Sequence, residues 1–66
     1  MTQWNEKVVK SLINDVKGWR MRYALHKRFF EEKNLVWVSK RVRIPREKIR
    51  QAELGVIHQY RRLETF

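Results

Sequence analysis

The segment LVWVSKRVRIPREKIRQAEL, residues 35–54, decides between two folds for this chain. In its first half, residues 35–44, β-branched residues are frequent and two arginines alternate with Val42 and Ile44, as in a β-strand. The same stretch also places Val38 and Val42 four residues apart with basic residues on the opposite side, as in a short helix. The pattern leaves both interpretations open, and the flanking residues must favour one.

Pro45 is the strongest boundary signal in the chain, because proline fixes its own backbone and disfavours helix in the residue before it. We expect Pro45 in the first turn of a helix over residues 46–54 that buries Ile49. Gly55 then supplies a turn, and residues 56–63 resume a short apolar pattern.

The N-terminal half predicts amphipathic helices, because apolar residues recur at helical spacing from residue 4 to residue 30. Thr2 or Asn5 supplies the first cap, and we expect the aromatic residues of the stripe to be core. Gly18 interrupts the pattern, so a second helix is expected over residues 19–32, closed at Lys33-Asn34 because Asn tolerates the left-handed conformation. The sequence therefore favours one all-α domain over residues 1–66, with an α/β form carrying a β-ribbon at 35–44 as the alternative.

The N-terminal apolar stripe is wider than one small domain needs to cover. We therefore expect part of it to form the two-fold interface of a homodimer. The residues expected at this interface are Trp4, Val8, Val9, Leu12 and Ile13.

Size and charge restrict the class of partner. Sixteen Lys and Arg against seven Asp and Glu give a net charge of +9 on 66 residues, a self-repulsion that a polyanion relieves. A chain of this length buries only about 60% of its unfolded surface, so we expect added stability from self-association or a ligand.

The chain has no Cys, and its two His lie far apart, so no metal site and no cofactor are expected. We expect a cytoplasmic protein that does not enter a membrane.

The sequence gives no sign of an enzyme. The four Ser and Thr residues have no spacing that would pair them with a base, and the two glycines cannot build a phosphate-cradling loop. By contrast, six of the eleven residues from Lys40 to Arg50 are basic and only Glu47 is acidic, which marks one face as an electrostatic footprint. The segment also contains Arg and Gln, which pair well with guanine and adenine in the major groove.

Residues 30–55 resemble the helix-turn-helix of the phage Cro and C1 repressor family. Val38-Ser39 corresponds to the apolar-Ala pair of the family's second helix, Ile44-Pro45 to the Ile-Ser that opens the third, and Glu53-Leu54-Gly55 to the closing signature. Two departures stand out. Val36-Trp37 lies where the family has Thr-Gln, and Arg43 replaces the usual glycine of the turn, which requires another turn geometry or a shifted boundary.

The resemblance implies a sequence-specific duplex-DNA-binding protein, acting as a small transcriptional regulator or architectural cofactor of phage or plasmid type. The residues expected to contact base edges are Arg46, Glu47, Lys48, Arg50 and Gln51. Those expected to hold phosphates are Lys40, Arg41, Arg43, Arg61 and Arg62. Because few residues follow Gly55, the N-terminal helix must replace the family's later helices in the core.

Three alternatives stay open. Residues 41–47 also resemble the strand-to-helix junction of ribbon-helix-helix repressors, in which paired strands enter the major groove. Basic helices bind structured RNA through backbone contacts, so RNA remains an alternative partner. A third class is a protein that binds and inhibits another protein without contacting DNA.

Overall fold

Four helices account for the regular structure of residues 4–64, the part of the chain that the computed structural model describes. They are α1 (Glu6–Asn14), α2 (Trp19–Phe30), α3 (Leu35–Val42) and α4 (Arg46–Glu64). The expected all-α class is confirmed. Residues 35–44 contain helix α3 and no strand, so the β-ribbon alternative is wrong.

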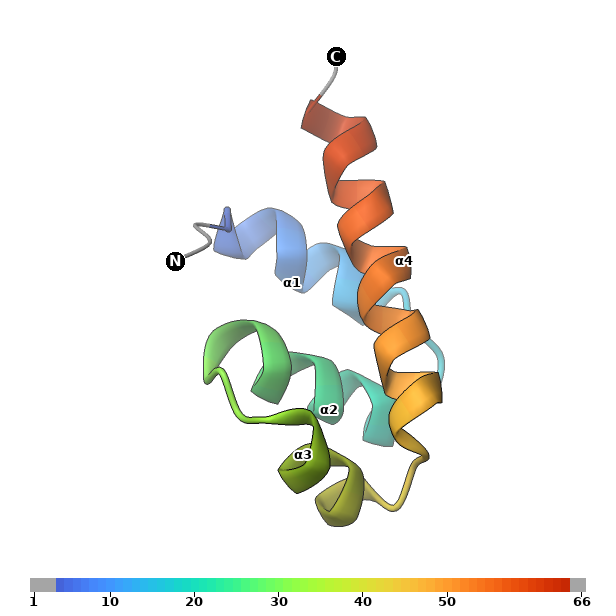
Figure 1. The fold of residues 1–66 in the computed structure, drawn as a ribbon. Helices are drawn as coiled ribbons and strands as arrows, with labels where there is room; N and C mark the ends of the chain where they lie inside the picture. The colour runs from blue at the N-terminus through green and yellow to red at the C-terminus, as the bar shows by residue number, and fades with distance from the viewer. Residues whose placement is uncertain (1–3, 65–66) are drawn as a thin grey trace.

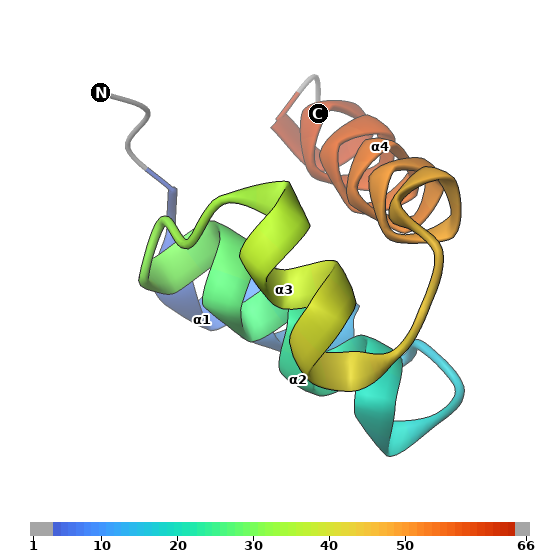
Figure 2. The same cartoon turned by 60° about the horizontal axis from the view of Figure 1, so that its bottom comes forward.

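Helix α4 organises the fold because it packs against each of the other three helices (Figure 1). Its N-terminal half lies beside α2 and α3, and its C-terminal half continues past α1. Figure 2 shows the same molecule with α3 and its connection to α4 turned toward the viewer. The α3–α4 connection therefore lies at one end of the molecule.

Two apolar clusters form the core, and α4 contributes to both. One cluster joins α1, α2 and the C-terminal half of α4, and it contains Val9, Ile13, Leu25, Val56 and Tyr60. The other joins α2, α3 and the N-terminal half of α4, and it contains Ala24, Val38, Val42 and Ile49. Burying a side chain of this size contributes about 1.5–3 kcal/mol relative to leaving it exposed, which explains why short helices suffice.

The sequence predicted a turn at Gly55, but α4 continues through this residue. The two-cluster core explains the difference. Ile49 and Val56 are seven residues apart, close to two helical turns, and Tyr60 follows one turn later. A continuous helix therefore buries all three on one side. Glycine within a helix costs only about 1 kcal/mol relative to alanine, which this burial offsets.

The helix boundaries follow local backbone chemistry. Gly18 separates α1 from α2 as expected, and its φ of 89° is one that L-residues rarely adopt. The Asn5 side chain caps α1 by accepting a hydrogen bond from the Val8 amide at 3.3 Å, whereas Thr2 lies outside the described residues. The prediction that Asn34 closes α2 is wrong, because α2 ends at Phe30 and Glu32 takes the left-handed conformation with a φ of 54°.

Burial corrects two expectations about the N-terminal stripe. Val9 and Ile13 are completely buried in the core of the monomer, so they cannot form a dimer interface. Trp19 was expected in the core but is 67% exposed, because it opens α2 at the end of the molecule away from the α1 cluster. Trp4 does pack inside, with edge-to-face ring contacts to Phe29 at 5.5 Å and Tyr60 at 5.1 Å between centroids.

Candidate nucleic-acid interface

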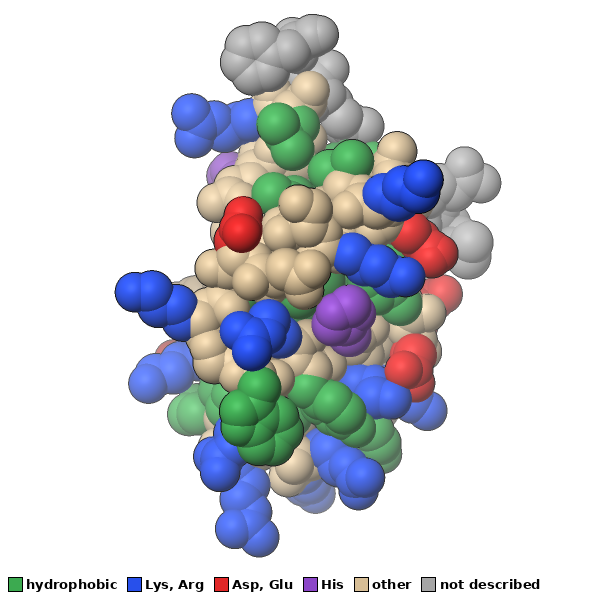
Figure 3. Space-filling view, turned by 180° about the vertical axis from the view of Figure 1, so that it is seen from behind, with side chains coloured by type: hydrophobic (Ala, Val, Ile, Leu, Met, Phe, Trp, Pro, Cys, Tyr) green, Lys and Arg blue, Asp and Glu red, His purple; other side chains and the backbone are tan. Residues whose placement is uncertain are grey.

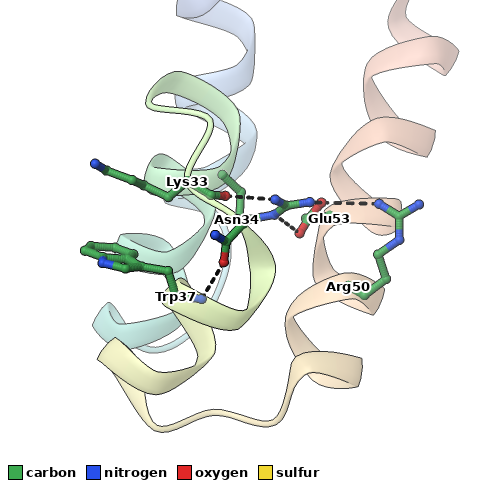
Figure 4. Close-up of polar contacts among 6 residues, drawn as sticks. Lys33, Asn34, Trp37, Arg50 and Glu53 are labelled. Carbon is green, nitrogen blue, oxygen red and sulfur yellow. Dashed lines mark hydrogen bonds and ion pairs between the residues drawn. The ribbon is translucent and has the colours of Figure 1, made fainter.

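Helix α3 presents its basic residues because Val38 and Val42 face inward. Asn34 caps the helix, and its Oδ1 accepts a hydrogen bond from the Trp37 amide at 2.7 Å (Figure 4). Val38 and Val42 are buried, as the helical interpretation predicted. Lys40 and Arg41 are consequently exposed in the last turn of α3.

The connection from α3 to α4 is short and hydrogen-bonded. Arg43 has φ 59° and ψ 41°, so an arginine adopts the left-handed conformation at the position where the sequence analysis noted a missing glycine. Its amide donates to the Ser39 carbonyl at 2.8 Å, and the Ser39 hydroxyl donates to the Ile44 carbonyl at 2.6 Å. Pro45 directly precedes α4, and its carbonyl accepts the first helical hydrogen bonds, from Lys48 and Ile49.

The first turns of α4 place a second set of polar side chains at the same end. Ile49 is completely buried against α2 and α3, which orients the rest of the turn outward. The exposed residues are the five predicted to contact bases, Arg46, Glu47, Lys48, Arg50 and Gln51. The structure thus brings these residues together with the basic residues of α3 and the connection.

We call the six cations of this region the basic face. Its residues are Lys40, Arg41, Arg43, Arg46, Lys48 and Arg50, and all are exposed. Figure 3 shows Lys and Arg side chains gathered around the lower end of the molecule, where α3 and the α3–α4 connection lie in Figure 1. A concentration of like charge with one intervening carboxylate, Glu47, creates a positive potential that attracts polyanions.

A buried carboxylate links the basic face to α2. Glu53 is only 5% exposed and receives two hydrogen bonds from Arg28, Nε to Oε2 at 2.7 Å and Nη2 to Oε1 at 3.2 Å. Arg28 also donates to the Lys33 carbonyl at 2.8 Å, and Arg50 Nη1 reaches Glu53 Oε1 at 3.3 Å (Figure 4). The paired forks of Arg28 and Glu53 hold α4 against α2, and the weaker contact orients Arg50, whose side chain is 54% exposed.

Two predicted phosphate contacts, Arg61 and Arg62, lie elsewhere. They are in the last turn of α4, eleven or more residues after Arg50, the last residue of the basic face. At 1.5 Å per residue this separation is at least about 16 Å along the helix. The structure therefore does not join Arg61 or Arg62 to the basic face.

Sequence reasoning missed the contributions of Arg28 and Trp37. Arg28 pairs with a residue 25 positions away, a distance at which no local sequence pattern signals a contact. Trp37 is 39% exposed, with the Lys33 ammonium 5.3 Å and the Arg41 guanidinium 6.0 Å from its ring centroid. Its signal was visible, since residue 37 is not one of the inward positions, 38 and 42, of the helical pattern.

The ion pair of Lys27 and Glu31 on α2 shifts the pKa values of both partners. Lys27 Nζ and Glu31 Oε2 are 2.7 Å apart, one turn apart on α2. The hydrogen bond to Lys27 lowers the pKa of Glu31, and the reciprocal bond raises the pKa of Lys27. The pair stabilises the end of α2 and lies outside the basic face.

The residues of other kinds of site do not converge within residues 4–64. This part of the chain contains no cluster of three or more His, Asp or Glu side chains that could hold a metal ion. None of its helices is both long and apolar enough to span a bilayer. Comparison with known proteins found no match to a family model, a curated sequence or a solved structure.

Proposed function

We propose that the protein binds duplex DNA sequence-specifically, and that α3, residues 43–45 and the start of α4 act as a helix-turn-helix. The observation that carries the proposal is the basic face, in which two helices and their connection expose six cations at one end. In this arrangement α4 is the recognition helix, because an α-helix fits the major groove of B-DNA, which is about 12 Å wide.

The two sets of polar residues have different roles in this proposal. Arg46, Arg50 and Gln51 are exposed on the first turns of α4, around the buried Ile49, and their side chains form paired hydrogen bonds with guanine and adenine. Glu47 and Lys48 complete this surface. Lys40, Arg41 and Arg43 precede α4 and hold phosphates, which fixes the position of α4 in the groove.

The backbone of Arg43 supports the resemblance to the Cro and C1 repressor family. The family obtains its turn from glycine, whereas here Arg43 adopts the left-handed conformation itself. The turn geometry can therefore be kept at a position where the sequence departs from the family. Arginine at position 43 also adds a cation near the DNA phosphates. The resulting gain in DNA binding offsets the cost of the left-handed backbone.

A domain that binds duplex DNA through one basic face acts on transcription by occupying a site, so we propose a regulator or an architectural cofactor. A homodimer would double its footprint on DNA. Because Val9 and Ile13 are buried, we propose that the dimer forms through an apolar groove between α1 and α4. The groove includes the half-buried Leu12, and Leu63, which is 54% exposed, lies at its far end. Leu63→Glu should convert a dimer to a monomer in sedimentation, whereas Leu54→Glu should not. A wild-type monomer at tens of micromolar, with or without DNA, would refute dimerisation.

The experiment that tests DNA binding is a salt titration with labelled duplexes enriched from a random pool. The three phosphate contacts of the basic face predict a slope of log affinity against log salt of about −2.7 for a monomer and about −5.4 for a dimer. A slope near zero would refute the proposal, and tighter binding to hairpin RNA than to every duplex would assign the basic face to RNA.

Single substitutions then separate base contacts from phosphate contacts. Arg46→Ala should cost about 1–3 kcal/mol on the enriched duplex and less on a scrambled one. Arg41→Ala should weaken both duplexes equally and make the slope shallower by about one. Arg61→Ala is the matched control, since it removes the same charge from the distant end of α4. If Arg61→Ala weakened binding as much as Arg41→Ala, the assignment to the basic face would be wrong.

A further inference from the structure

A groove of about 380 Å³ lies where the first turn of α2 meets the last turn of α3. Its lining residues are Trp19, Arg20, Tyr23, Arg41, Val42 and Arg43. Three of the six are arginines, two are aromatic, and none is acidic. The groove thus combines a cationic lining with flat apolar rings, a combination distinct from that of the apolar groove between α1 and α4.

Trp19 is the most exposed large apolar side chain of residues 4–64 that the structure reveals, with 67% of its surface in solvent. It packs into neither core cluster, and the Arg20 guanidinium lies 5.8 Å from its ring centroid. An exposed indole contributes little to stability, and this one lines the groove together with the aromatic ring of Tyr23. Trp19 is therefore placed to contact a ligand rather than to support the fold.

The lining defines the chemistry of the ligand. Guanidinium groups bind phosphate oxygens with two parallel hydrogen bonds, and Arg41 and Arg43 line the groove from the end of α3. Indole and phenol rings stack on nucleobases of any sequence, and Trp19 and Tyr23 of α2 provide both. A volume near the lower end of the range of about 300–1,000 Å³ for small-ligand sites suits one nucleotide, not a helix.

We propose that this groove binds one unpaired nucleotide of single-stranded DNA, with its base stacked on Trp19 and its phosphate held by Arg41 and Arg43. The groove adjoins the connection to α4, so a strand that leaves a duplex on the basic face reaches it directly. The inference rests on the proposed function only through the two shared arginines. Trp19, Arg20 and Tyr23 belong to α2, outside the basic face, and serve no role in the duplex binding proposed above.

The test compares a blunt duplex with the same duplex carrying a short thymidine overhang, using fluorescence anisotropy. Stacking of one base predicts about 5- to 100-fold tighter binding of the overhang duplex. Trp19→Ala should abolish this gain and leave the affinity for the blunt duplex unchanged, and Trp19→Phe should keep part of the gain. Trp37→Ala is the matched control, because Trp37 is exposed on α3 but does not line the groove, and it should preserve the overhang's advantage.

The possible outcomes separate this inference from the proposed function. Equal affinity for blunt and overhang duplexes would overturn the groove assignment while leaving duplex binding intact. Binding of single-stranded oligonucleotide that depends on Trp19, without any binding of blunt duplex, would support the groove and overturn the proposed function. Competition by thymidine monophosphate as strong as that by the overhang strand would identify a free nucleotide as the ligand and overturn the assignment to a strand.

Discussion

Replacing Arg43 by glycine should make the protein more stable and its DNA binding weaker. The left-handed backbone at Arg43 costs an L-residue about 1–2 kcal/mol, and glycine avoids this cost. Glycine also has greater freedom in the unfolded chain, which returns about 0.4–1 kcal/mol. The net expectation is a gain of about 0.5–1 kcal/mol in the free energy of unfolding, or about 2–8 °C in Tm. The hydrogen bond from residue 43 to the Ser39 carbonyl survives, since it uses the backbone amide.

Glu32→Gly is the matched control for this experiment. Glu32 is the other non-glycine residue of the described chain with a positive φ, 54°, so it should gain a similar stability. It carries no cation, so the salt slope of duplex binding should stay the same, whereas Arg43→Gly should make it shallower by about 0.9. Thermal melts followed by circular dichroism and anisotropy titrations measure the two effects. A fall in Tm for Arg43→Gly, or an equal change of slope in both variants, would refute the reasoning.

Four further substitutions test the fold. Gly55→Ala should raise the free energy of unfolding by about 0.5–1 kcal/mol, because Gly55 is helical and a Cβ there meets open space. Gly18→Ala should lower the free energy of unfolding by about 1 kcal/mol, because Gly18 has a φ of 89°. The opposite order of stability in urea melts would contradict a continuous α4. Arg28→Ala should destabilise by about 2–4 kcal/mol because it leaves a buried carboxylate with one weak partner, and an effect below about 0.5 kcal/mol would show that the pair is not buried. Because its pKa is lowered, Glu31 stabilises the fold above its unfolded pKa of about 4.5 and loses this effect as the pH falls through its folded value. The Tm difference between wild type and Glu31→Gln should therefore shrink as the pH falls below 4.5, and a Tm difference that stays constant would contradict the ion pair.

The sequence predicted the helices whose apolar spacing is regular and left open the one whose composition conflicts with its structure. Residues 35–42 include three β-branched valines, yet this segment is helical because Val38 and Val42 pack against Ala24 and Ile49. This contact joins three helices and is invisible in a local pattern. Tertiary packing therefore overrides a strand propensity that amounts to about 1 kcal/mol at most.

The predictions that were wrong concern residues whose type suits two different local structures. Asn34 was predicted to end α2 but begins α3, since asparagine suits both a left-handed end and an N-cap. Gly55 was predicted to turn the chain, but it lies inside α4. Its helical conformation depends on the burial of Val56 and Tyr60, which follow it in the chain. The exposed residues of α4 were predictable once Ile49 was placed inside, whereas the Arg28–Glu53 pair and the exposure of Trp19 required the three-dimensional structure.

The most direct test of the central claim is to map the DNA-binding surface by nuclear magnetic resonance. Uniformly ¹⁵N-labelled protein would be titrated with a short enriched duplex, and the amide shift of each residue would be followed. The account predicts that the largest changes fall in residues 40–51, spanning the end of α3, the connection and the first turns of α4. Changes concentrated in α1 and the last turn of α4, or spread evenly over all four helices, would contradict it.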